Sequence, residues 1–69
     1  MRIRYVPETD TLLIDFKDEP VADSEFIEEL GVVIDYNKRG EVVGLEILDW
    51  KEFQKEGKEL NIALPSGIS

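Results

Sequence analysis

Three carboxylates stand inside apolar runs of the sequence, and they are the residues best suited to chemistry. Asp15, Asp35 and Glu46 each interrupt a run of aliphatic and β-branched side chains. Gathered on one face of a sheet, they could hold Mg²⁺ or Ca²⁺ through oxygen ligands, or work as an acid/base pair. An antiparallel sheet with one solvated face shows the same alternation without any chemistry. We therefore expect these three acids to carry neither catalysis nor a metal ion.

The rest of the composition excludes several kinds of site. The chain has no cysteine and no histidine, which removes disulfides, thiolate metal sites and the commonest general base. Its serines have no histidine to activate them, and its five glycines are scattered rather than gathered in a phosphate-binding loop. The acidic segment "DEPVADSE" lacks the spacing of a calcium-binding EF-hand loop. We expect no catalytic residue, no metal ligand and no cofactor.

The net charge of −8 lies in one third of the chain. Residues 8–29 hold nine acids and one base, whereas the remaining residues hold seven of each. Binding nucleic acid through its phosphates needs a basic face, so this distribution argues against it. The acidic field would instead attract a basic protein partner. The candidate partner surface consists of Asp18, Glu19, Asp23, Glu25, Glu28 and Glu29.

A first hairpin opens the chain. Residues 2–6 and 11–16 have the apolar alternation of strands, and the turn-forming residues "PETD" separate them. If Val6 pairs with Thr11, the apolar residues of both strands fall on one face.

A second hairpin follows, with the four-residue loop "NKRG" between residues 32–36 and 41–47. Its first apolar stripe consists of Val32, Ile34 and Tyr36, and its second of Val43, Leu45 and Ile47. We predict that Ile34 pairs with Val43, because the loop then brings both stripes to one face.

The segments beside the hairpins are less regular. Residues 22–29 fit a short strand or a single helical turn, and we favour the strand. Asp49 followed by Glu52 predicts a capping box and a helix over residues 50–56, with Gly57 as its C-terminal stop.

Aromatic side chains of this helix should pack against the sheet. Trp50 and Phe53 lie one turn apart, so we expect both on the apolar face, with Trp50 substantially buried. The alternating residues 59–64 predict a short edge strand or a contact with a second subunit. Residues 65–69 should form a loose tail.

These elements predict a single domain over residues 1–69 of the α+β class. It should be a small antiparallel β-meander of four to five strands, built from two β-hairpins, with a short C-terminal helix on one face. So small a core gains only about 3–5 kcal/mol, and oligomerisation often supplements it. The face opposite the helix is partly apolar, which favours a homo-oligomer. The candidate oligomer surface consists of Leu13, Val33, Val42 and Leu48.

The order and spacing of the motifs resemble a known family. "MRIRYVPETDTLLIDF", then "EPVADSE", then "GVVIDYNKRGEVVGLEILD" are similar to the domain of unknown function 2283 family, over residues 1 to 49. The resemblance implies a small β-rich bacterial or archaeal protein, no established activity and no catalytic residues. Some members look like neighbours of small toxin-like proteins, which implies a partner-binding role. The chain departs from the family pattern at Val6, Trp50 and residues 57–69.

The sequence as a whole favours a non-enzymatic module for protein interaction or self-association. One alternative is an antitoxin-like inhibitor of a small basic toxin. A second is a divalent-metal or hydrolytic site at the three carboxylates of the sheet. No apolar run approaches the ~20 residues of a membrane span and no signal peptide opens the chain, so we expect a cytoplasmic protein with no membrane partner.

Overall fold

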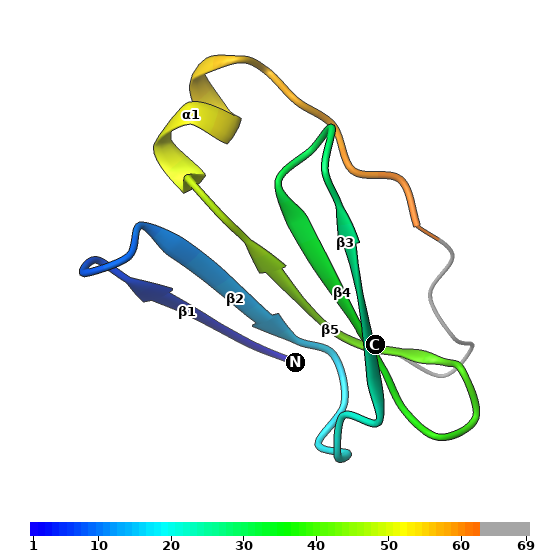
Figure 1. Cartoon of the computed structure of the whole chain (residues 1–69). Coiled ribbons are helices and arrows are strands. Elements are labelled where there is room, and N and C mark those ends of the chain that lie inside the picture. Colours follow the sequence, from blue (N-terminus) through cyan, green and yellow to red (C-terminus); the bar gives the residue numbers. More distant parts are fainter. Residues whose placement is uncertain (63–69) are drawn as a thin grey trace.

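The computed structural model describes residues 1–62, which form five strands and one helix. Along the chain these are β1 (Arg2–Val6), β2 (Thr11–Asp15), β3 (Asp23–Ile27), β4 (Val32–Tyr36), β5 (Val42–Ile47) and α1 (Trp50–Lys55). The strands make a single antiparallel sheet in the order β1-β2-β5-β4-β3 (Figure 1). The predicted α+β class, with antiparallel strands followed by a short helix, is confirmed.

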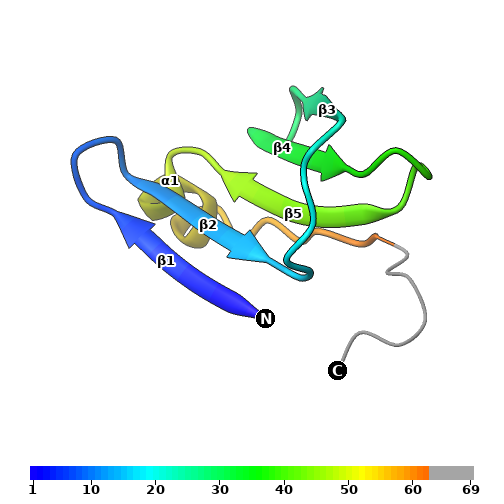
Figure 2. The same ribbon diagram turned by 90° about the horizontal axis from the view of Figure 1, so that it is seen from below.

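The last strand of the described residues, β5, lies in the middle of the sheet. It pairs with β2 on one side and with β4 on the other, so it joins the two halves of the fold. The connection between β2 and β3 therefore passes across the end of the sheet to reach the far edge (Figure 2). This order leaves β1 and β3 as the two edge strands.

The first hairpin has the predicted register. Val6 pairs with Thr11 and Ile3 pairs with Ile14, and the loop is closed by hydrogen bonds to Val6 and Pro7 carbonyls. Loop length and apolar alternation therefore determine this pairing together.

The predicted register of the second hairpin is wrong by two residues. Ile34 pairs with Leu45, not with Val43, and a bulge shifts the register between Asp35 and Tyr36. Asp35 pairs with Gly44 and Tyr36 with Val42, so Val43 is the extra residue on β5. Its carbonyl accepts hydrogen bonds from the backbone N–H groups that follow β2, at 2.8 and 3.3 Å. A bulge of this kind serves to end one pairing and bend the strand.

The bulge also turns Val42 inward, while Val43 itself stays buried at 2% exposed. An extra residue reverses the alternation on its N-terminal side, so Val42 turns inward and is 7% exposed. The assignment of Val42 to the outer, oligomer-forming face is therefore wrong. The buried core cluster consists of Val32, Ile34, Val42, Leu45, Ile47 and Phe53.

The helix begins and ends by different means. Asp49 is the N-cap but has a left-handed backbone and makes no side-chain capping bond, so the predicted capping box is wrong. The C-terminal stop at Gly57 is confirmed: Gly57 has a φ of 64° and donates to the Gln54 carbonyl. The Lys58 N–H donates to the Phe53 carbonyl, which completes a Schellman motif.

The helix and the segment after it cover one face of the sheet. Phe53 is buried in the core, and Trp50, Leu60 and Ile62 pack against it while half-buried. Trp50 stacks on Phe53 with ring centroids 5.7 Å apart, but Phe53 takes the deeper position. Residues 58–62 form no strand, so the predicted edge strand is absent from their part of residues 59–64. The remainder of that strand and the predicted tail over residues 65–69 lie outside the described residues.

Candidate functional site

The outer face of the sheet, opposite α1, brings Asp15 and Asp35 together. Both pair with Gly44, one from β2 and one from β4, so the three residues form one row across the sheet. A Cβ built on Gly44 would lie 3.5 Å from Asp15 Oδ1 and 3.5 Å from Asp35 Oδ2. Glycine therefore leaves open the space between two carboxylates. The predicted register opposed Asp35 to Val42, and the bulge replaces that arrangement.

Glu46 stands in the next row of the same face, between Leu13 on β2 and Val33 on β4. Burial against these neighbours raises the pKa of Glu46, and the charge and hydrogen bond of Asp35 raise it further. The Asp35 carboxyl group thus acts on Glu46 across the β4–β5 ladder.

The ends of the acidic row already have partners. The Arg2 guanidinium donates to Asp15 Oδ2 at 3.1 and 3.3 Å, and Ser24 Oγ donates to Asp35 Oδ1 at 2.7 Å. Among residues 1–62, no three or more carboxylates are placed so that they could hold a metal ion. Each aspartate of the row is bonded to its own neighbour, Asp15 to Arg2 and Asp35 to Ser24, so the row holds two separate side-chain contacts rather than a set of ligands around one ion.

The rest of the outer face is partly apolar. Leu13 and Val33 are half-buried on either side of Glu46, and Phe26 on β3 extends their row with 57% of its surface exposed. Leu48 follows β5 and is half-buried. No helix covers this face within the described chain, because α1 packs on the other side.

The predicted acidic surface divides into two parts. Asp23 and Glu25 lie on β3, Glu28 and Glu29 lie in the turn after it, and all four are exposed. Asp18 is exposed in the connection that precedes β3. These five carboxylates make no ion pair with any residue in the described part of the chain.

Glu19 belongs instead to an ion-pair network at the end of the sheet. It pairs with Arg39 at 2.9 Å and with Lys17 at 3.7 Å, and Glu41 contacts the same two cations. Glu19 therefore has cation partners, unlike the other acids of the predicted surface.

Asn37, which is 6% exposed, holds this network together. Its amide nitrogen donates to Glu19 and Glu41, and its oxygen accepts from the backbone N–H groups of Arg39 and Glu41. The bond from Asn37, and then the one from Arg39, lower the pKa of Glu41. Sequence reasoning treated "NKRG" as a turn and missed the network; the asparagine beside a run of charges is its only signal.

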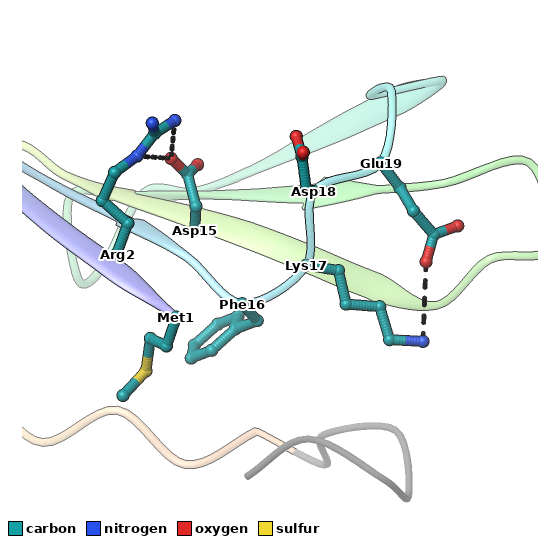
Figure 3. Close-up of a pocket in the computed structure, with 7 residues that line it drawn as sticks. All are labelled: Met1, Arg2, Asp15, Phe16, Lys17, Asp18 and Glu19. Carbon is teal, nitrogen blue, oxygen red and sulfur yellow. Dashed lines mark hydrogen bonds and ion pairs between the residues drawn. The ribbon is translucent and has the colours of Figure 1, made fainter.

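A cavity of about 400 Å³ opens between the start of β1 and the connection after β2 (Figure 3). Met1, Arg2 and residues 15–19 line it. Arg2 pairs with Asp15 and Lys17 with Glu19, so the two cations at its wall already have partners. Neither cation is therefore free to bind an anionic ligand in this cavity.

The fold and these surfaces define a small α+β protein built on one sheet, with an acidic edge strand and an open outer face. The chain belongs to the family described as Protein of unknown function (DUF2283), whose model matches residues 2–51. The match includes strands β1 to β5 and the start of α1, and it confirms the resemblance read from the motifs. No curated protein and no solved structure significantly matches the chain. No helix within residues 1–62 is long and apolar enough to cross a membrane.

Proposed function

We propose that the chain is a non-enzymatic interaction module that binds a basic protein segment at its acidic edge. One observation carries the proposal: Asp23, Glu25, Glu28 and Glu29, on β3 and its turn, are exposed and have no cation partner in the described chain. Asp15, Glu19, Glu41 and Glu56 do have such partners, whereas other unpaired acids, such as Glu8 and Glu52, lie on other elements. These four carboxylates thus form one group of unpaired charges along a single edge.

Unpaired carboxylates favour a cationic partner in two ways. Their combined field speeds the encounter with a basic protein, and it discourages acidic competitors. Both effects weaken as salt rises, because the Debye length falls to about 8 Å at physiological ionic strength. A small basic toxin, for which the chain would act as an antitoxin-like inhibitor, is one partner of this chemistry.

The test is a titration of ¹⁵N-labelled protein with basic, neutral and acidic peptides of equal length. We expect shifts of backbone resonances over residues 18–29 with the basic peptide, and weaker binding at higher salt. The neutral and acidic peptides should leave the spectrum unchanged. Equal responses to all three peptides, or shifts confined to another surface, would contradict the proposal.

Self-association is the second candidate, and the open outer face favours it. Leu13, Val33 and Phe26 lie in one uncovered row, and a homodimer would remove them from water. Sedimentation at increasing protein concentration tests this, with Leu13→Ser expected to shift the distribution toward monomer. A chain that stays monomeric at every concentration would exclude it.

A metal or hydrolytic site at the three outer-face carboxylates has less support. Arg2 and Ser24 already engage the two aspartates, and Glu46 lies in a different row. Calorimetric titration with Mg²⁺, Ca²⁺ and Mn²⁺ separates this alternative from the interaction module.

A further inference from the structure

The acidic edge is also an open edge of the sheet. β3 pairs with β4 and with no second strand among residues 1–62. Residues 23–26 are all exposed, and Phe26 is among the most exposed large apolar side chains of the described chain. An edge strand presents unpaired N–H and C=O groups, which form a template for another strand.

The two sides of β3 have different chemistry. Asp23 and Glu25 project on the side of the core face, since they pair with Tyr36 and Ile34. Phe26 projects on the outer face, beside Val33. A strand added along this edge would therefore meet carboxylates at alternate positions on one side and an aromatic ring on the other.

The carboxylates of β3 also determine which residue types an added strand should contain. Two copies of β3 facing one another would place carboxylates opposite carboxylates, which is unfavourable. A strand with lysine or arginine at alternate positions would instead place each cation about 5 Å from an acid. Glu28 and Glu29, in the turn at one end of β3, extend the acidic field beyond the strand.

We propose that β3 recognises its partner by strand addition, and that the partner segment is extended, with basic and apolar residues alternating. This inference rests on the proposed function and adds to it the conformation and pattern of the partner. Backbone hydrogen bonds to β3 supply affinity, the cations opposite Asp23 and Glu25 select the segment, and an apolar side chain covers Phe26.

The probe is a capped peptide of about eight residues in which lysine and valine alternate. A block peptide of the same composition, with all lysines first, has equal charge but not the pattern. Two further peptides have the alternating sequence with N-methyl groups on every second residue. The methyl groups lie along one edge of the strand in the first peptide and along the opposite edge in the second. We expect the alternating peptide to bind at least tenfold more tightly than the block peptide. One N-methylated peptide should lose binding and the other retain it, because only one edge of the added strand faces β3.

Substitutions in the protein, rather than in the peptide, test the same contacts. Glu25→Gln keeps an acceptor for the Tyr36 hydroxyl, which donates to Glu25 at 2.8 Å, but removes the charge. We expect it to weaken binding of the alternating peptide by about fivefold, and Phe26→Ala by a similar factor. Glu8→Gln, an exposed acid in the β1–β2 loop, makes the same change of charge and should leave the affinity within about twofold.

The outcomes separate the two proposals. If basic peptides bind residues 18–29 whatever their pattern or N-methylation, strand addition is wrong and the interaction module stands. If no basic peptide binds, both are wrong. β1 also alternates basic residues, Arg2 and Arg4, with the exposed Ile3 and Tyr5. The strand that competes with a partner segment for the β3 edge is therefore β1 of a second copy. If the free chain forms concentration-dependent polymers, and Glu25→Gln prevents them, then β3 pairs with β1 of a second copy rather than with a partner segment. That result would overturn the proposal.

Discussion

The Tyr5 hydroxyl donates a hydrogen bond of 2.7 Å to Oδ1 of Asp10. The other carboxylate oxygen of Asp10 accepts from the Lys51 N–H at 3.3 Å, and its backbone carbonyl accepts from the Trp50 N–H at 2.9 Å. A residue of the first loop therefore caps the helix that lies some forty residues later in the chain. This contact takes the place of the capping box that Asp49 does not form.

Replacing aspartate with glycine, either at position 10 or at position 49, tests this cap. Asp10 and Asp49 both have a positive φ, 53° and 49°, so glycine fits either backbone without strain. Asp10→Gly should lower the free energy of unfolding by about 1–2 kcal/mol, because it removes two side-chain bonds. Asp49→Gly should leave it unchanged or raise it by up to about 1 kcal/mol. Urea denaturation measures both, and equal effects would place the cap elsewhere.

Phe53 and Trp50 should differ in what their removal costs. Phe53 is 9% exposed in the core cluster, so Phe53→Ala should destabilise the chain by about 3–5 kcal/mol. Trp50→Ala should cost less, since part of the indole already faces water. Thermal melts followed by circular dichroism make the comparison, and a lower midpoint for Trp50→Ala would show that the tryptophan carries the helix contact.

Gly44→Ala should destabilise the centre of the sheet. The added Cβ would lie 3.1 Å from the Ile14 carbonyl oxygen and would also enter the space between Asp15 and Asp35. Overpacking typically costs about 1–3 kcal/mol, more than alanine gains over glycine in the unfolded chain. Denaturant unfolding measures the difference. A variant as stable as the parent would mean that β2 moves away from β5 without penalty.

Glu46 should make the chain less stable as pH rises through the acidic range. Its pKa in the folded state is above the usual value, so the folded chain binds more protons than the unfolded chain between the two pKa values. This contribution to stability is full below the unfolded pKa and is lost as pH climbs through the raised one.

Glu46→Gln mimics the protonated form and should abolish this slope. We expect it to stabilise the chain at neutral pH by less than about 1 kcal/mol, since solvent screens a partly exposed group, and to match the parent at low pH. Glu28→Gln, in the exposed turn after β3, is the control for loss of one charge. Unfolding curves at several pH values give the comparison, and parallel profiles for Glu46→Gln and the parent would contradict it.

Asn37→Ala should loosen the end of the sheet where two loops meet. The change removes four hydrogen bonds and leaves the Arg39 and Glu41 N–H groups without their acceptor, so a loss of about 2–3 kcal/mol is expected. Lys38→Ala, at an exposed neighbouring position, should change little. Amide exchange at Glu41 reports the effect locally, and unchanged protection would exclude it.

The sequence by itself determined the local elements. Four-residue turns and period-two alternation place Ile3 against Ile14, and Gly57 ends the helix, because each depends on neighbours close in the chain. The extended conformation of β3 and the family of the chain were also predicted from the sequence. The inward face of Ile34 was also correct, although its partner was not.

Only the tertiary structure decided how the hairpins join. The pairing of β2 with β5 unites residues about thirty positions apart, and no local pattern specifies which edges meet. The bulge at Val43 turned Val42 into the core and set Gly44 between Asp15 and Asp35. Asp10 became the helix cap by the same long-range packing. Each of these features reflects the free energy of burying the whole sheet, to which every strand contributes at once.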